Sequence, residues 1–244
     1  MVTEACEEFK MLLESSPYFG HLRDAIEREP SRFQSALDLG CGPGLRDLRL
    51  LRELGVSVLV GIDAAHKRDP LVRRDSIDYV CADVDAHHVP TSDESFDLVI
   101  MDNVIEHIYD PRRLLGECRR VLKKGGILAV LTPNQARLIN RFRLLLGRSV
   151  YYPLDVWLGT RQEHISRKGQ MVFAGHIREY TIVELGRMLN LVGFEIESVH
   201  LYPSARPSPR EEMSKSKVVL ATYNMAEKVL PGSGYMISVL AIKV

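Results

Sequence analysis

From residue 35 onward, the chain alternates short apolar segments with longer stretches of helical periodicity. The apolar segments predict strands at residues 35–39, 57–62, 77–81, 96–101 and 126–132, with helices between them at 45–54 and 111–122. Strands separated by crossover helices pair in parallel, because each helix returns the chain to the same end of the sheet. The alternation therefore predicts an α/β fold with a doubly wound, mostly parallel sheet.

The remaining segments complete a single expected domain over residues 1–244. Further strands at 194–202 and 235–243 bring the sheet to seven strands, and further helices are expected within 4–28, 181–192 and 217–230. We divide the domain into an N-terminal helical cap at 1–34, a core at 35–134, a lid-like insertion at 135–175 after the fifth strand, and a C-terminal part at 176–244. A chain of this length can bury a large hydrophobic core.

Composition argues against several classes of protein. The formal net charge is zero, so no overall field attracts nucleic acid. The acidic start, MVTEACEEFK, lacks the layout of a signal peptide, and no apolar run reaches the roughly 20 residues that span a bilayer. We expect a cytoplasmic protein with reduced thiols, because no CxxC pair occurs among its four cysteines, which are Cys6, Cys41, Cys81 and Cys118.

A glycine-rich loop, ALDLGCGPG at 36–44, joins the first strand to the first helix. Gly40, Gly42 and Gly44 allow positive φ and let a ligand approach the backbone closely. Leu45 stands where a dinucleotide fingerprint requires its third glycine, which argues against a nicotinamide cofactor and a dehydrogenase. Asp38 at the strand end favours a ligand that carries an ammonium or a sulfonium. The alternative is a glycine turn that binds nothing.

Two more acids follow the next two strands. Asp63 ends the second strand, where a carboxylate can accept both hydroxyls of a ribose, and Asp83 follows the third, where it can accept from an adenine amino group. Each acid taken alone is also typical of a helix N-cap or a solvated loop. Together, at the carboxyl ends of consecutive parallel strands, they predict a nucleoside-binding crevice.

These motifs resemble those of the class I S-adenosylmethionine-dependent methyltransferases. The resemblance covers residues 35–134 and rests on LDLGCGPG, GIDAA, ADVDAHHVP, SFDLVIMDNVIEHIYDP and LKKGGILAVLTPN. It implies a Rossmann-like methyltransferase fold that ends in an antiparallel hairpin, S-adenosylmethionine as cofactor, and methyl transfer as activity. The expected cofactor-binding residues are Asp38, Gly40, Cys41, Gly42, Asp63, Ala64, Asp83, Val84, Asp102 and Asn103.

Two histidines are candidates for the general base that a hydroxyl acceptor requires. His107 lies just past the fourth strand, beside the expected crevice, and His176 precedes the helix that Thr181 is placed to cap. We expect both to line the acceptor site, with one of them acting as base. The alternative for His107 is a structural histidine at a helix start that hydrogen-bonds the backbone.

The same segment resembles a metal-dependent subset of the superfamily. Small-RNA 2′-O-methyltransferases and ubiquinone-pathway O-methyltransferases carry a Glu-x-x-Glu-His run and a later histidine that together hold a divalent cation. Glu106, His107 and His176 match this pattern, but Asn103 replaces the first glutamate. An amide oxygen is a weaker ligand for a hard cation than a carboxylate. The metal site is therefore left open, with the metal-free interpretation preferred.

We expect the acceptor to be a hydroxyl of a small or lipid-linked molecule such as a saccharide. The alternatives are an RNA 2′-hydroxyl or a quinone precursor with a divalent metal, or a non-catalytic scaffold that only binds the cofactor. Neutral charge argues against nucleic acid. Residues 137–148 carry four arginines and no acid among apolar residues, which suits peripheral contact with an anionic membrane or a phosphate-bearing substrate. The alternative is a lid helix packed on the domain.

Overall fold

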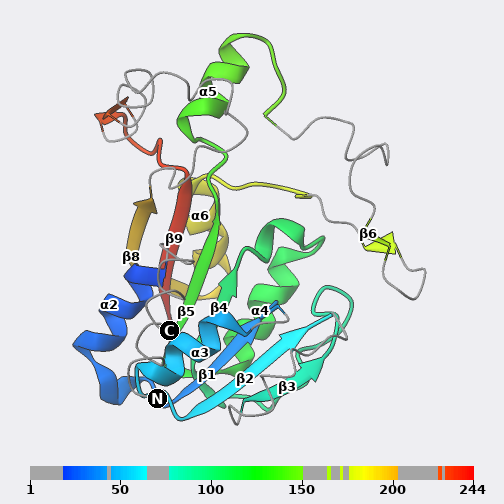
Figure 1. Cartoon of the computed structure of the whole chain (residues 1–244), viewed down its shortest axis with the longest axis vertical. Helices are drawn as coiled ribbons and strands as arrows, with labels where there is room; N and C mark the ends of the chain where they lie inside the picture. The colour runs from blue at the N-terminus through cyan, green and yellow to red at the C-terminus, as the bar shows by residue number, and fades with distance from the viewer. Residues whose placement is uncertain are drawn as a thin grey trace, which may run out of the picture.

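In the computed structural model, residues 19–42, 45–64, 77–150, 164–165, 171–172, 176–202, 225–226 and 229–244 are described. Seven strands form one sheet in the order β3-β2-β1-β4-β5-β9-β8 (Figure 1). Their bounds are β1 Ser35–Leu39, β2 Val58–Asp63, β3 Asp78–Cys81, β4 Phe96–Asp102, β5 Leu122–Pro133, β8 Phe194–Tyr202 and β9 Met236–Lys243. The first five pair in parallel, and β9 pairs antiparallel to both β5 and β8. The seven-stranded, mostly parallel sheet is confirmed, as is the final hairpin.

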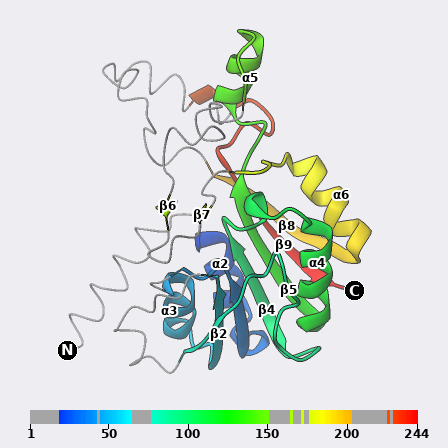
Figure 2. The ribbon, with the colours of Figure 1, turned by 90° about the vertical axis from the view of Figure 1, so that its right-hand side faces the viewer.

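Helices cover both faces of the sheet, which makes the fold doubly wound. One face carries α2 (Gly20–Arg28) and α3 (Arg46–Glu53), and the other carries α4 (Pro111–Val121) and α6 (Ile182–Val192), as Figure 2 shows. Each face has its own apolar core. Leu48 and Leu51 of α3 belong to one core, and Leu114 of α4 and Leu185 of α6 belong to the other.

Two helix starts are capped by side chains, and the cap at Thr181 is one that the sequence predicts. The Asp110 carboxylate accepts from the backbone N–H of Arg113 at 3.1 Å, and Pro111 takes the first helical position of α4. At the start of α6, Thr181 and Glu184 form a reciprocal capping box. These caps fix where the loops at the carboxyl end of the sheet enter their helices.

The fifth strand begins earlier than we expected. The sequence suggests a helix stop through residues 123–125 and a strand from 126, whereas β5 begins at Leu122 directly after α4. The register between β4 and β5 shifts between Phe96 and Leu98, and Gly125 has φ of +72°. A local irregularity in the β4–β5 pairing accommodates Gly125, so β5 continues through residues 123–125, where the sequence suggests a helix stop.

The insertion contains the helix α5 (Leu138–Leu145) and the short strands β6 (His164–Ile165) and β7 (Met171–Val172). The two strands form a separate two-stranded sheet that we did not expect. Figure 1 shows α5 projecting beyond the end of the main sheet. The expected helices within 4–18 and 217–224, Gly44, and most of 151–175 lie outside the described residues. In the part of the chain that is described, no helix is long and apolar enough to cross a membrane.

Candidate active site

The glycine loop after β1 is held against β2 and β4 at the carboxyl end of the sheet. Gly40 and Gly42 have φ of +72° and +65°. A Cβ at Gly40 would lie 2.5 Å from a Val104 methyl carbon, so no larger residue fits there. The backbone N–H of Gly42 donates to the Asp63 carboxylate at 2.9 Å. The loop and the end of β2 are thus joined by the acid that the sequence assigns to ribose binding.

A cavity of about 380 Å³ opens at this edge of the sheet, a volume within the range of small-molecule sites. Its lining includes six of the predicted cofactor-binding residues and one predicted catalytic residue. These are Gly40, Asp63, Ala64, Asp83, Val84, Asn103 and His107. Sequence reasoning missed Asp85, Val104, Ile108, Tyr109 and Ile177, which also line the cavity.

Asp85 has an identifiable role in shaping this cavity. Its carboxylate accepts from the backbone N–H of Tyr109 at 3.1 Å, which ties the loop after β3 to the loop after β4. Asp83 Oδ1 accepts from the backbone N–H of Asp85 at 2.9 Å, the loop role that we weighed as its alternative. The second acid of the sequence ADVD was the available signal for Asp85.

An acidic cluster lies behind the glycine loop. Asp38 is 1 % exposed, and its Oδ2 has no hydrogen-bond partner among the described residues. Burial, followed by the nearby carboxylates of Asp47 and Asp102, raises the Asp38 pKa well above its usual value. Burial and the neighbouring Asp47 also raise the pKa of Asp102 to about 7.

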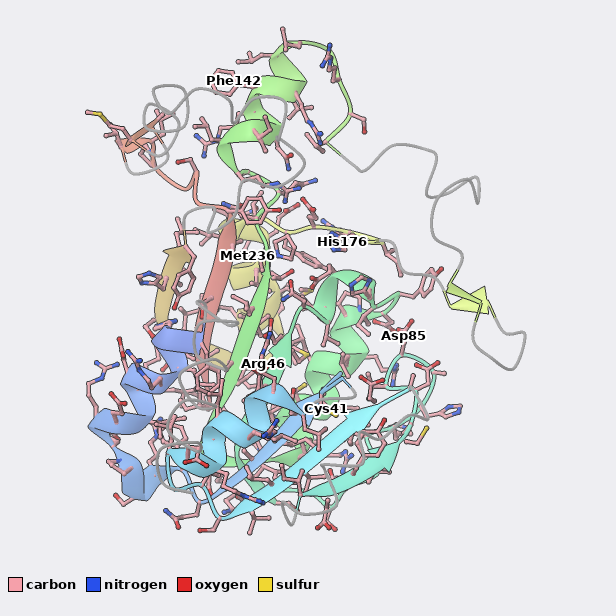
Figure 3. The ribbon with its side chains drawn as sticks, viewed as in Figure 1. Cys41, Arg46, Asp85, Phe142, His176 and Met236 are labelled. Atoms are coloured by element: carbon pink, nitrogen blue, oxygen red, sulfur yellow. The ribbon has the colours of Figure 1, made fainter. Side chains whose placement is uncertain are left out.

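One guanidinium faces these three carboxylates. Arg46 pairs with Asp47 at 2.8 Å and with Asp102 (Figure 3). Among the described residues, one guanidinium faces three acids, which suits this end of the site to a cationic ligand. Cys41 does not line the cavity. Its Sγ would lie 2.8 Å from a Cβ added at Gly61, so its side chain packs on the glycine of β2.

The structure brings the two predicted catalytic histidines together. Their ring centroids lie 5.1 Å apart, edge to face. His107 lies on the short helix η4 (Ile105–His107), and His176 belongs to the segment that leads into α6. The Glu106 carbonyl accepts from the backbone N–H groups of Ile177 at 2.8 Å and Arg178 at 3.2 Å. This backbone clamp places two segments distant in sequence beside each other.

Glu106 adds a buried carboxyl group under the histidine pair. The residue is 0 % exposed, its Oε2 accepts from the Thr132 hydroxyl at 3.0 Å, and burial raises its pKa to about 7. Its Oε1 has no hydrogen-bond partner within the described part of the chain. One ligand atom from each of Glu106, His107 and His176 falls within 4.8 Å of the others. Two imidazoles and a carboxylate with an unpaired oxygen can hold a divalent cation.

Asn103, where the resemblance to metal-dependent relatives fails, is turned toward its neighbour. The residue has φ of +56°, and its Nδ2 donates to the Asp102 carboxylate at 2.5 Å. Among the described residues, the candidate metal group is formed by Glu106, His107 and His176.

Comparisons with known proteins show which family this chain is similar to. Residues 16–199 match a family model described as a methyltransferase domain. A ubiquinone biosynthesis O-methyltransferase of Cereibacter sphaeroides is 36% identical over 119 residues, which cover 46% of this chain and 47% of that protein. A probable S-adenosylmethionine-dependent methyltransferase of Mycolicibacterium smegmatis is 30% identical over 174 residues, or 67% of this chain and 53% of the relative.

The chain thus spans about half the length of these curated relatives. Among solved structures, an S-adenosylmethionine-dependent methyltransferase from Mesorhizobium loti superposes with a TM-score of 0.53 at 20% identity, covering 86% of this chain and 90% of the other. At that identity the likeness establishes the fold alone.

Proposed function

We propose that this chain, which belongs to the class I S-adenosylmethionine-dependent methyltransferases, methylates a hydroxyl of a small or lipid-linked acceptor such as a saccharide. The observation that carries the proposal is the His107–His176 pair, with centroids 5.1 Å apart, where His107 lines the cavity that begins at the glycine loop. A hydroxyl acceptor must lose a proton as its oxygen is methylated, and an imidazole beside the cavity can accept it.

The residues around the cavity fit the cofactor. The buried Oδ2 of Asp38, which has no hydrogen-bond partner among the described residues, suits the cationic methionine end. We assign the ribose hydroxyls to Asp63 and the adenine end to Val84 beside Asp83, all of which line the same cavity. S-Adenosylmethionine supplies an activated methyl group, and the protein aligns the acceptor oxygen with it.

In the proposed reaction, the acceptor oxygen bonds to the methyl carbon while the carbon–sulfur bond breaks. The hydroxyl proton passes to His107 or His176, and the products are a methyl ether and S-adenosylhomocysteine. Alignment supplies much of the rate, and a positioned base adds roughly 10²–10⁴-fold.

A second candidate is a metal-dependent O-methyltransferase of a quinone precursor or an RNA 2′-hydroxyl. The donor group of Glu106, His107 and His176 supports it, as does the similarity to a ubiquinone biosynthesis O-methyltransferase. A cation held there would bind the acceptor oxygen and lower its pKa. The missing carboxylate at Asn103 keeps this candidate second.

The acceptor class is testable by a panel assay. Purified protein is incubated with labelled S-adenosylmethionine and with free sugars, lipid-linked saccharides, catechols or RNA, and S-adenosylhomocysteine is quantified with and without EDTA. We expect turnover on a hydroxyl acceptor that EDTA leaves unchanged. Loss of turnover in EDTA, restored by Mg²⁺, would favour the second candidate. Cofactor binding in calorimetry without turnover on any acceptor would instead indicate a scaffold.

We also propose that the outer surface of α5 contacts an anionic membrane and so reaches a lipid-linked acceptor. Its exposed apolar residues are Phe142, Leu144, Leu145 and Leu146. Figure 3 shows Phe142 on α5, beyond the end of the main sheet. No acid occurs in 137–148, and Arg143 and Arg148 lie among the apolar residues. Apolar side chains interspersed with arginines are the pattern of helices that lie in the lipid headgroup region.

The membrane proposal is testable with vesicles and a matched pair of leucines. Leu145 on α5 and Leu191 on α6 are both 81% exposed. We expect wild-type protein to sediment with phosphatidylserine-containing vesicles but not with phosphatidylcholine vesicles. The double variant Phe142→Ser, Leu145→Ser should weaken vesicle binding about 10–100-fold, because it loses two apolar side chains that insert into the membrane. Leu191→Ser should bind as the wild type does. Equal binding by all three proteins would refute the proposal.

A further inference from the structure

A buried ion pair joins the start of α5 to the segment that carries His176. Arg137 Nη1 and Nη2 donate to the two carboxylate oxygens of Glu179 at 2.7 and 3.0 Å. The two side chains are 6% and 7% exposed. Arg137 also lies over the Tyr235 ring, with 5.2 Å between the guanidinium carbon and the ring centroid. A buried pair of this kind contributes little net stability, because desolvation of both charges offsets their attraction.

Glu179 has a second partner, which is His176. The Glu179 carboxylate lies 3.2 Å from His176 Nδ1, and the Asn140 amide of α5 approaches the same carboxylate at 3.5 Å. Arg137 donates to both carboxylate oxygens of Glu179, and this pairing favours the ionised carboxylate. Glu179 is therefore an anion with one oxygen directed at the imidazole.

We propose that Glu179 is a positioning residue for His176, and that Arg137 holds Glu179 in place. A carboxylate at Nδ1 fixes the neutral imidazole with its proton on that nitrogen. Nε2 then keeps a lone pair that can accept a proton or bind a cation. The role of His176 in catalysis rests on the proposed function. The contacts of Glu179 with His176 and Arg137 do not depend on which acceptor is methylated.

The backbone hydrogen bonds of the described residues around Glu179 hold the chain but do not involve the His176 imidazole. Ile177 and Arg178 donate to the Glu106 carbonyl, and Gln135 N–H donates to the Tyr180 carbonyl at 2.9 Å. These bonds fix the path of the chain on both sides of Glu179 but do not fix the His176 ring, which is about one-third exposed. Among the described residues, the His176 ring packs edge to face on His107 and is hydrogen-bonded by Glu179, so Glu179 is the group that can select its tautomer. Arg137 directly precedes α5, so its ion pair with Glu179 connects the insertion to the candidate site.

The protonation of His176 can be measured directly, without an acceptor. In protein labelled with ¹⁵N-histidine, two-bond ¹H–¹⁵N spectra of the neutral ring show which nitrogen bears the proton, and His176→Gln assigns the signal. We expect the Nδ1–H form in the wild type and a shift toward Nε2–H in Glu179→Met. Because a lone buried Arg137 can prevent folding of that variant, Arg137→Met with Glu179→Met removes the pair together and should give the same shift.

Arg143→Met on the same helix is the matched control and should leave the His176 spectrum unchanged. An Nε2–H ring in the wild type, or an unchanged Nδ1–H ring in the folded double variant, would overturn the inference. Calorimetry should show S-adenosylmethionine binding within about threefold of wild type in the double variant, since neither Arg137 nor Glu179 lines the cavity assigned to the cofactor.

A double-mutant cycle on an acceptor found by the panel assay separates this inference from the proposed function. The paired Met variant should lower kcat/KM about 10–100-fold in the wild-type background and by less than about twofold in a His176→Ala background. Equal losses in both backgrounds would mean that Glu179 does not act through His176. If His176→Ala turns over the acceptor as fast as wild type, the role of His176 in the proposed reaction is wrong. The ¹⁵N spectra still test whether Glu179 fixes the His176 tautomer.

Discussion

Of the variants His107→Ala and His176→Ala, the one that removes the general base is expected to lower kcat by about 10²–10⁴-fold. The rings lie 5.1 Å apart, so both can reach one acceptor hydroxyl, but only one needs to take its proton. The other variant should show a smaller loss, expressed mainly in KM, because its ring positions the acceptor. Cofactor binding should stay within about threefold in both, since the methyl donor is held by the glycine loop and the acids.

The measurement is S-adenosylhomocysteine formation at saturating cofactor, together with calorimetric binding of S-adenosylmethionine. His200→Ala is the matched control, because His200 lies exposed on β8 with its ring 4.3 Å from that of Tyr202. It should retain wild-type turnover. Full turnover in both His107→Ala and His176→Ala, with cofactor binding intact, would eliminate the histidine-base mechanism.

The sequence predicted the parts of the site that depend on local pattern. Asp63 and the glycine loop meet because both follow parallel strands, and parallel strands end at one edge. The histidine pair was predicted from position after β4 and before α6, and the structure brings it together. In these cases topology alone converts sequence position into proximity.

The contacts that escaped prediction join residues whose individual patterns carry no signal. Arg137 is one of four arginines in the basic run 137–148, and Glu179 is an acid that no motif in the sequence singles out. Their pairing, across 42 positions, depends on how the insertion leaves β5 and how the chain returns to α6. The early start of β5 was missed for a related reason, because a bulge at Gly125 allows a strand where local propensity favours a stop.

The second large effect is expected at Asp38. We expect the affinity for S-adenosylmethionine to rise with pH, and Asp38→Asn to weaken binding at pH 8 by roughly 30-fold or more, the loss typical of removing one partner from a buried charge pair. The Asp38 pKa is raised by burial and by Asp47 and Asp102, so the free protein holds a proton there above the usual range. The cationic end of the cofactor favours the carboxylate, so binding lowers this pKa and releases the proton.

The sign of the pH effect follows from linkage. Below the raised pKa of the free protein, binding must expel a proton, so affinity falls as the pH falls; above it, affinity reaches a plateau. The same raised pKa means that the free protein loses stability as the pH rises from the ordinary aspartate value toward the raised one, and the bound cation offsets this loss. Calorimetry in buffers of different ionisation enthalpy, from pH 6 to pH 8, measures both the affinity and the protons released.

Asp102 has to be separated from Asp38, because its own pKa of about 7 lies within the pH range of the measurement. Asp102 pairs with Arg46 and accepts from Asn103, whereas Asp38 Oδ2 has no such partner among the described residues. Asp102→Asn should therefore remove only part of the proton release, while Asp38→Asn removes the larger part and most of the affinity. Asp93→Asn, an exposed acid paired with Arg120, serves as the control. Flat affinity across the pH range, with Asp38→Asn binding as wild type does, would show that the methionine end of the cofactor is held elsewhere.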